Sequence, residues 1–268
     1  MFSDIKIRSI TALFLASVCF VTLYLGGIYL KIFLSLISVV LFFEWMRIIS
    51  RNHWILRGFV SILFFILVFY SEGYNAIDLL IVVSGILILS SFSSFFSISS
   101  FWSSFGFFYI LASISIIELM RSTEKGLIGI LIVLSTIIIS DISGYIFGKL
   151  LSGPRIFKTI SPNKTYSGFA ASLIFGVFWF SILSISFSNY NIFGYLIVGF
   201  LIVLSSISGD LLLSFLKRKV DLKDSGSFLP GHGGLFDRAD SILSVFFLLL
   251  PLSILSGNLE NPIKLILG

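Results

Sequence analysis

The chain alternates long apolar runs with short polar interruptions. A helix that crosses a bilayer needs roughly 20 apolar residues, with a range of about 17–25. A segment inside lipid must also satisfy its own backbone hydrogen bonds, so such runs predict helices. We predict nine spans, at residues 9–30, 32–49, 55–71, 75–92, 102–120, 126–149, 168–188, 191–216 and 239–257. The pattern therefore predicts an all-α, polytopic membrane bundle of about nine transmembrane helices.

The least distinct boundary separates the fourth and fifth runs. The Ser-rich stretch Ser90–Ser104 interrupts the apolar pattern there without introducing a charge. Two interpretations stay open at this point: two separate spans, or one long broken or re-entrant element, which membranes tolerate where protein covers the backbone.

Composition excludes a soluble globular protein. Of the 268 residues, 57% are hydrophobic and only 12% are charged, whereas soluble domains carry about 25% charged residues. The first apolar run follows basic residues, as in a signal peptide, but it is longer than an h-region and lacks a cleavage site, so we expect it to be retained. The single cysteine, Cys19, excludes an intrachain disulfide.

The basic residues indicate an orientation rather than a nucleic-acid partner. With nine spans and a cytoplasmic N-terminus, all but four of the 18 Lys and Arg residues fall on the cytoplasmic side, as the positive-inside rule requires. The four on the other side are Lys31, Arg121, Lys125 and Lys264. This orientation predicts a multi-pass protein of the cell (cytoplasmic or inner) membrane whose two polar loops, residues 150–167 and 217–238, face the cytoplasm.

The first 120 residues carry little chemistry. Glu44 is the most notable residue there, and we expect it to form a structural ion pair near Arg47 and Arg51 or to lie at the interface. We therefore interpret residues 1–120 as scaffold helices with oligomer contacts, and residues 121–268 as the catalytic region.

Polar residues gather at the end of the sixth span and in the loop after it. Four residues spaced i, i+3, i+4 and i+7 share one face of the predicted helix: Asp141, Gly144, Tyr145 and Gly148. The two glycines allow a neighbouring helix or a ligand to approach closely. The loop then supplies hydroxyls and lysine charge suited to gripping phosphate, at Ser161, Lys164 and Thr165.

A second polar group spans the eighth and ninth helices and the loop between them. One polar face runs along the eighth span, formed by Ser206, Asp210, Ser214 and Lys217. This face continues into a glycine-rich loop and the start of the ninth span, with Arg218, Lys223, Asp224, His232, Gly233, Gly234, Asp237, Arg238 and Asp240.

Clustered carboxylates beside lipid need counter-charge. Hard divalent cations such as Mg²⁺ take carboxylate oxygens together with substrate phosphates, and paired cations can clamp a displacement at phosphorus. Glycines let backbone N–H groups approach an anion, and basic side chains offset a triphosphate. These residues favour phosphoryl or nucleotidyl transfer at the cytoplasmic membrane face.

The same segments resemble the phosphatidate cytidylyltransferase family, also called CDP-diglyceride synthases. The resemblance is carried by Ser214-Phe-Leu-Lys217-Arg218, Lys223-Asp224-Ser225-Gly226, Leu229-Pro-Gly-His232-Gly-Gly234 and Asp237-Arg238-Ala-Asp240, with Asp141–Gly148 and Ser161–Gly168 in the same order. It implies CTP and phosphatidic acid as substrates, CDP-diacylglycerol and pyrophosphate as products, Mg²⁺ with a possible second cation (K⁺ or Mg²⁺), and a homodimer.

The resemblance also implies roles for individual residues. It makes Asp210 and Asp237 the metal ligands and catalytic groups. The other catalytic positions are Asp240, Asp141, Lys217 and Arg218. The substrate-binding positions are Ser161, Lys164, Thr165, Lys223, Asp224, His232, Gly233, Gly234 and Arg238. Ser167 and Leu213 stand where the family often has Glu.

Other functions stay open at the level of sequence. A CTP-dependent lipid kinase or an ether-lipid cytidylyltransferase would need similar groups. A cation transporter would place its carboxylates near the middle of the bilayer, whereas here they flank a cytoplasmic loop. A non-catalytic membrane scaffold is the remaining alternative.

Overall fold

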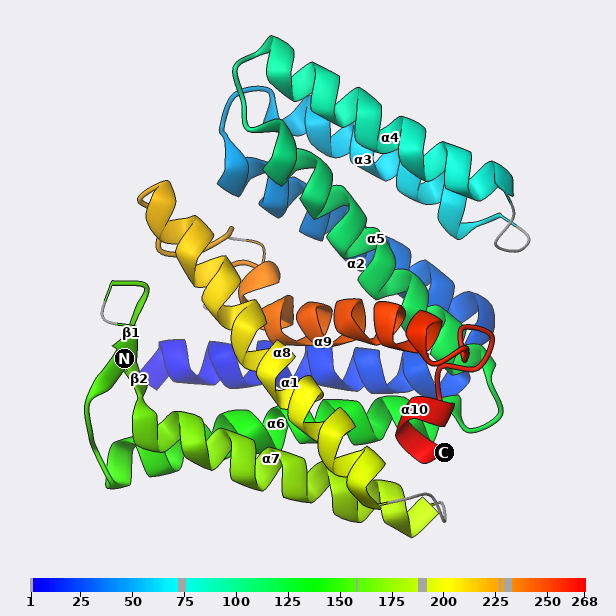
Figure 1. Cartoon of the computed structure of the whole chain (residues 1–268). Helices are drawn as coiled ribbons and strands as arrows, with labels where there is room; N and C mark the ends of the chain where they lie inside the picture. Colours follow the sequence, from blue (N-terminus) through cyan, green and yellow to red (C-terminus); the bar gives the residue numbers. More distant parts are fainter. Residues whose placement is uncertain (1, 72–75, 158, 188–191, 227, 229–232) are drawn as a thin grey trace. The chain divides into compact units, whose positions relative to one another are not determined.

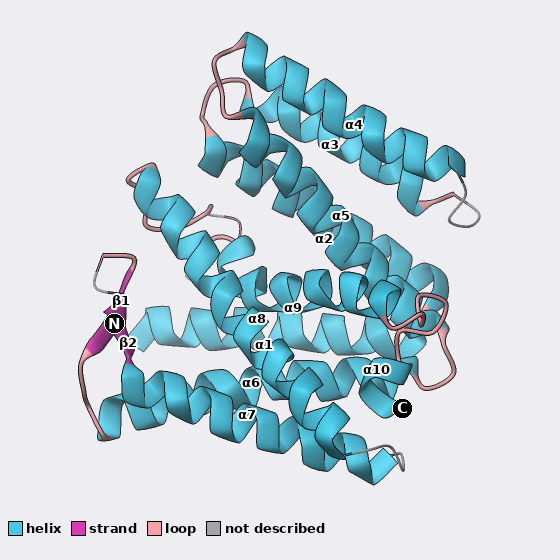
Figure 2. Cartoon of the chain, in the orientation of Figure 1, coloured by secondary structure: helices cyan, strands magenta, loops and turns pink. Residues whose placement is uncertain are grey.

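The computed structural model is almost entirely helical and describes residues 2–71, 76–157, 159–187, 192–226, 228 and 233–268 (Figures 1 and 2). Its helices are α1 Phe2–Leu25, α2 Gly27–Ile49, α3 Trp54–Phe69, α4 Ala76–Phe95, α5 Ser100–Ser122, α6 Gly126–Leu150, α7 Tyr166–Phe187, α8 Ile192–Lys219, α9 Phe236–Leu255 and α10 Lys264–Leu267. Its strands are β1 Arg155–Phe157 and β2 Ser161–Thr165.

Each predicted apolar run corresponds to one helix from α1 to α9. Within the described residues, six helices are long and apolar enough to cross a membrane, namely α2 and α5 to α9. The apolar parts of α1, α3 and α4 are shorter. The chain is thus an all-helical, multi-pass membrane protein, and the count of nine spans stays a prediction.

The junction between α1 and α2 and the one between α4 and α5 differ from the predicted ones. The break between the first two helices falls at Gly26 rather than near residue 31, because Gly26 adopts a positive φ of 62° that only glycine reaches without strain. The Ser-rich stretch is mostly helical, with α4 ending at Phe95 and α5 beginning at Ser100. Its serines fit a helix because they can donate back to the preceding turn, as Ser103 Oγ does to Ser99 O at 3.0 Å.

The segment predicted as a loop at 150–167 contains a small antiparallel hairpin, which the sequence did not predict, within the otherwise helical fold (Figure 2, magenta). Arg155 pairs with Thr165 and Phe157 with Ser161, with an irregular register between them. The backbone N–H of Tyr166 donates to Pro154 O at 3.1 Å, which closes the base of the hairpin beside α7.

The loop predicted at 217–238 is shorter than expected. Helix α8 continues to Lys219, so Lys217 and Arg218 are helical, and α9 begins at Phe236, so Asp237 lies in its first turn. Helix α8 ends where Asp221 takes a left-handed φ of 52° and Leu222 N donates to Lys217 O at 2.9 Å. A left-handed residue with such a bond is a common way to satisfy the last carbonyls of a helix.

The chain divides into two compact units, residues 1–115 with 216–239, and residues 116–215 with 240–268. The segment that contains Asp237 thus belongs to the unit of the N-terminal helices. In this unit, Trp45 of α2 lies so close to α5 that a Cβ at Gly106 would collide with its ring. Its indole N–H donates to Trp102 O at 2.9 Å, which fixes α2 against α5.

Arg57 in the same unit stabilises the end of α2. It is fully buried, and its guanidinium donates to the carbonyls of Met46 at 2.9 Å and Ser50 at 2.6 Å. Met46 O also accepts from Ser50 N at 3.2 Å, whereas Ser50 O lies at the end of the helix, where carbonyls lack intrahelical partners. Arg57, which the charge pattern counted among the cytoplasmic basic residues, is therefore a buried helix cap.

Glycine contacts join the helices of the second unit. Helices α6 and α7 run side by side (Figure 1). A Cβ at Gly168 would stand 2.6 Å from Gly144 O and 3.2 Å from Gly148 Cα. The prediction that Gly144 and Gly148 allow close approach is confirmed, and the approaching element is α7. Helices α8 and α9 meet similarly at Gly209, where a Cβ would stand 2.5 Å from Asp240 O.

Candidate functional site

One charged cluster in the second unit is formed by α6, the hairpin and α8. The Lys164 ammonium on β2 pairs with Asp210 Oδ2 on α8 at 2.6 Å, and Ser214 donates to Asp210 Oδ1 at 3.3 Å. Asp141 on α6 interacts electrostatically with both Asp210 and Lys164. Two carboxylates and one ammonium thus share this place, as the sequence predicted for Asp141, Lys164 and Asp210.

The hairpin positions Lys164 by anchoring its end to α7. Thr165 Oγ1 accepts from Gly168 N at 3.2 Å, which satisfies an N–H at the start of the helix as an N-cap does. Ser167 donates to Ser152 O at 2.7 Å. Ser161 starts β2 opposite Phe157, at the other end of the strand from Thr165. Thr165 therefore has a structural role besides its predicted contact with substrate.

A second charged cluster lies in the first unit, around Asp237. Its Oδ1 pairs with the Lys217 ammonium at 2.6 Å. Its Oδ2 accepts from Ser225 N at 2.8 Å and from Gly234 N at 3.2 Å, and it lies 3.0 Å from Ser225 Oγ. The side chain of Asp237 is only 10% exposed. Asp237 therefore holds both ends of the glycine-rich loop.

Glu44 reaches the same loop from α2, a contact that the sequence did not predict. Its carboxylate is buried and accepts from Ser225 Oγ at 2.9 Å, Leu235 N at 3.0 Å and Phe236 N at 2.8 Å. The expected ion pair with a neighbouring arginine is wrong, because every hydrogen bond to Glu44 among the described residues comes from this loop or the start of α9. The only signal in the sequence was a carboxylate inside an apolar helix.

The remaining predicted residues lie around these clusters. Arg218, Lys223, Asp224 and Arg238 are exposed. Asp240 is half-buried, and its Oδ1 accepts from Ser241 N at 2.8 Å. Gly233 has a positive φ of 86° and lies against Asp224, while Gly234 is buried among Ser225, Gly226 and Glu44. His232 lies outside the described residues.

Leu213 and Ser167, which stand where the family often has Glu, both have a local structural role. Leu213 is buried, so its side chain belongs to the core. Ser167 takes part in the base of the hairpin through Ser152. Asp210 and Asp237 belong to different units, and their joint action stays a prediction.

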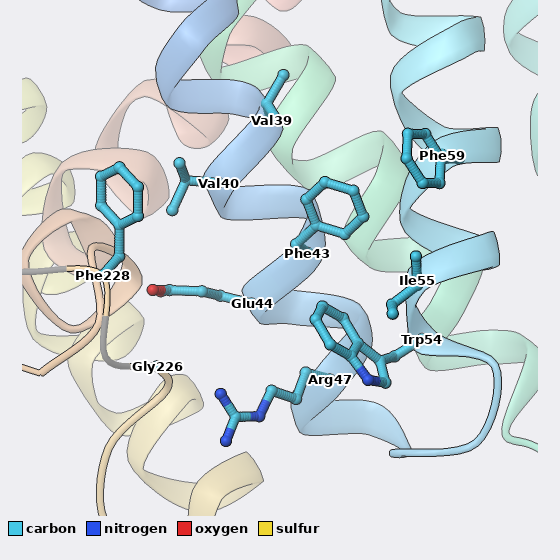
Figure 3. Close-up of a pocket in the computed structure, with 10 residues that line it drawn as sticks. All are labelled: Val39, Val40, Phe43, Glu44, Arg47, Trp54, Ile55, Phe59, Gly226 and Phe228. Carbon is cyan, nitrogen blue, oxygen red and sulfur yellow. The ribbon is translucent and has the colours of Figure 1, made fainter.

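An apolar groove lies between α2 and α3 in the first unit (Figure 3). It has a volume of about 480 Å³, within the roughly 300–1,000 Å³ of ligand pockets. Its lining is Val39, Val40, Phe43, Glu44, Arg47, Trp54, Ile55, Phe59, Gly226 and Phe228. Arg47 is its cationic residue. The Glu44 carboxylate in the same lining accepts its hydrogen bonds from the loop and the start of α9.

The oxygen atoms of both clusters fit a hard cation. Lys164 and Lys217 each place an ammonium 2.6 Å from a carboxylate oxygen, so positive charge is accommodated at both positions. Asp237 Oδ2 accepts from two backbone N–H groups. Its Oδ1 is held by Lys217 alone, so a cation at Oδ1 would stand beside that ammonium or replace it. The described part of the chain has no group of three or more Asp, Glu, His or Cys side chains that could hold a metal. A Mg²⁺ ion there would complete its coordination with water and phosphate, as it usually does.

Comparison with known proteins assigns the chain to a family. The sequence profile of the cytidylyltransferase family matches residues 6–254. This chain belongs to the cytidylyltransferase family. It is therefore a nucleotidyltransferase, as its sequence predicted.

Relatives in this family resemble the chain over most of its length. A phosphatidate cytidylyltransferase of Staphylococcus saprophyticus is 31% identical over 253 residues, which cover 91% of this chain and 97% of that protein. One from Brucella abortus is 28% identical over 257 residues, or 92% of each chain. One from Helicobacter pylori is 40% identical over 120 residues, or 45% of each chain.

Proposed function

We propose that this membrane protein is a phosphatidate cytidylyltransferase. It transfers the cytidylyl group of CTP to phosphatidic acid, yielding CDP-diacylglycerol and pyrophosphate. A phosphate oxygen of phosphatidic acid attacks the α-phosphorus of CTP, and the bond from that phosphorus to the bridging oxygen breaks. The observation that carries the proposal is similarity over about nine-tenths of the chain to proteins of that name.

The reaction brings two anions together, so its main requirement is positive charge rather than a base. The phosphate of phosphatidic acid is already a nucleophile. Lys164 and Lys217 each stand beside a carboxylate that orients them, and Arg218 is exposed. These three cations would bind CTP phosphates and offset the charge on the departing pyrophosphate.

The remaining predicted residues would contact the substrates around these basic side chains. Asp141 and Asp240 would orient the basic groups and water. Ser161, Thr165, Gly233 and Gly234 would offer hydroxyl and backbone donors to phosphate, with Lys223, Asp224, His232 and Arg238 completing the substrate contacts.

Asp210 and Asp237 would hold Mg²⁺, with a possible second cation, K⁺ or Mg²⁺. When bound, Mg²⁺ would neutralise phosphate charge on CTP. The support is the carboxylate of Asp210, which is 39% exposed, and Oδ1 of Asp237, whose close partner is the Lys217 ammonium. Each of the two carboxylates already has a lysine ammonium 2.6 Å from one of its oxygens.

We assign the groove between α2 and α3 to an acyl chain of phosphatidic acid. Its walls are apolar, while Arg47 places a positive charge among its lining, which complements a lipid phosphate. The groove also borders Gly226, next to Ser225, which donates to Asp237. A lipid held there would keep its tail in an apolar environment and its phosphate beside the loop.

The proposed setting is the cell (cytoplasmic or inner) membrane, with the N-terminus and both polar segments on the cytoplasmic side, where CTP is found. The distribution of basic residues supports this orientation. We also propose that the protein acts as a homodimer, as the resemblance implies, with helices of residues 1–120 as contacts and residues 121–268 as the main catalytic region.

The direct test is synthesis by the purified chain in detergent with CTP, phosphatidic acid and Mg²⁺. We expect CDP-diacylglycerol and pyrophosphate in equal amounts, and no product when Mg²⁺ is chelated. A matched preparation of Asp210→Asn should lose most of this activity. Absence of CDP-diacylglycerol from folded wild-type protein would refute the proposal.

A further inference from the structure

Two carboxylates from distant parts of the sequence hold the loop that connects α8 to α9. Asp237 binds it through Ser225 N and Gly234 N at 2.8 and 3.2 Å. Glu44 binds it through Leu235 N and Phe236 N at 3.0 and 2.8 Å. The Ser225 hydroxyl lies 2.9 Å from Glu44 Oε2 and 3.0 Å from Asp237 Oδ2. Ser225 therefore links the two carboxylates.

Glu44 acts at the start of α9. The first N–H groups of a helix have no intrahelical acceptor, and negative charge beside them is stabilising. Glu44 supplies this charge from α2, at the amides of Leu235 and Phe236, directly before Asp237. The neighbouring Trp45 adds a ring contact with Phe236 at 5.4 Å between centroids. The position of Asp237 thus depends on α2.

The loop leaves little freedom around the Glu44 carboxylate. A Cβ at Gly226 would collide with Oε1, and one at Gly234 would stand 2.7 Å from Oε2. Glu44 is only 6% exposed, and both of its oxygens already accept hydrogen bonds. Such a carboxylate is unsuited to exchanging protons with substrate and well suited to fixing geometry.

We propose that Glu44 is a positioning residue for the cytidylyl transfer. It fixes the first turn of α9 and, through Ser225, the orientation of the Asp237 carboxylate. This inference rests on the proposed function and goes beyond it, because it gives a residue of the N-terminal helices a part in the reaction.

The test is Glu44→Gln in the full-length chain, with Glu124→Gln as the matched control, since Glu124 is an exposed carboxylate between α5 and α6. The side-chain amide of Gln has only one acceptor oxygen, and its NH₂ group would face N–H or O–H groups that donate to the Glu44 carboxylate. In metal-free protein without substrates, hydrogen exchange at Leu235 and Phe236 should quicken by about 10- to 100-fold, as expected for losing a hydrogen bond to a charged acceptor. Other helices should keep their protection.

In the enzymatic assay, Glu44→Gln should lower kcat by about 100-fold, a typical effect of misplacing a reacting group by about 1 Å. The Mg²⁺ concentration for half-maximal activity should rise, which a mere loss of folded protein would not produce. Ser225→Ala is a milder second variant that keeps both carboxylates. Its effect and that of Glu44→Gln should be less than additive in the double variant, because both act through one network.

Faster exchange with unchanged kcat and Mg²⁺ dependence would overturn the inference and leave Glu44 a structural residue. Unchanged exchange at Leu235 and Phe236 would also overturn it, as would additive effects of the two substitutions. These outcomes differ from failure of the proposed function, which would appear as absence of CDP-diacylglycerol from the wild-type chain.

Discussion

Asp237 and Asp210 differ in how far their carboxylates are buried and in how many partners compensate their charge. Asp237 is 10% exposed and is surrounded by an ammonium, two backbone N–H groups and a hydroxyl. Asp210 is 39% exposed and has one close ammonium partner. Buried carboxylates require such compensation. Asp210 is therefore open to a ligand, whereas Asp237 also serves as a structural anchor.

Asp237→Asn removes the charge that pairs with Lys217 and places an amide among hydrogen-bond donors. We expect turnover to fall by about 100- to 1,000-fold, comparable to losing a preorganised electrostatic group, while the protein still purifies as a folded species. Initial rates with CTP and phosphatidic acid measure this. Asp221→Asn is the matched control, since Asp221 is exposed and Asn tolerates its left-handed conformation. Near-normal turnover of Asp237→Asn would contradict the assigned role.

Lys164→Met removes the ammonium that pairs with Asp210 and interacts electrostatically with Asp141. The variant should bind the CTP triphosphate less well, so the KM for CTP should rise by about tenfold, as expected from one lost charge-assisted contact. Titration of CTP at saturating phosphatidic acid measures it. Lys149→Met, an exposed lysine near the end of α6, should leave the KM unchanged. An unaltered KM in Lys164→Met would exclude Lys164 from the CTP site.

The apolar pattern was sufficient to predict the long helices, because lipid forces each long apolar run to satisfy its own backbone. It did not predict where they end. The break at Gly26 depends on a backbone conformation, and the serines around α4 and α5 are compatible with helix or loop. The hairpin was missed because Ser161-Pro-Asn-Lys-Thr165 shows no alternation of apolar and polar residues.

At the α6–α7 contact, Gly168→Ala should destabilise the protein. The added Cβ would stand 2.6 Å from Gly144 O, which is backbone and cannot rotate away. Overpacking of this kind costs about 1–3 kcal/mol, which unfolding in mixed micelles can measure. Ala170→Val adds volume at an exposed position of α7 and should have little effect. Equal stability of both variants would contradict close packing at Gly168.

At the α2–α3 groove, Val40→Trp should block the place assigned to the lipid tail. We expect the KM for long-chain phosphatidic acid to rise several-fold and the KM for CTP to stay unchanged. A short-chain phosphatidic acid should be less affected, because it fills less of the groove. Leu63→Trp, at an exposed position of α3 outside the groove, serves as control. Equal effects of Val40→Trp and Leu63→Trp on the KM for phosphatidic acid would contradict the assignment of the groove to a lipid tail.

At the scale of the whole molecule, the sequence motif indicated both charged clusters but not how they are built. Asp141, Lys164 and Asp210 lie in one cluster, as the resemblance implied. The contact of Glu44 with Ser225 joins residues 181 positions apart, which no local pattern can predict. The first unit contains N-terminal helices together with the segment that bears Asp237, so the predicted site residues do not all belong to one unit.

The central claim is that the α-phosphorus of CTP becomes part of the lipid. It is tested most directly by incubating the purified protein with phosphatidic acid, Mg²⁺ and CTP labelled at either the α- or the γ-phosphate, and then counting label in the extracted lipid. The account predicts that α-label enters the lipid and that γ-label is released as pyrophosphate. Transfer of γ-label to lipid would identify a lipid kinase instead and contradict the account.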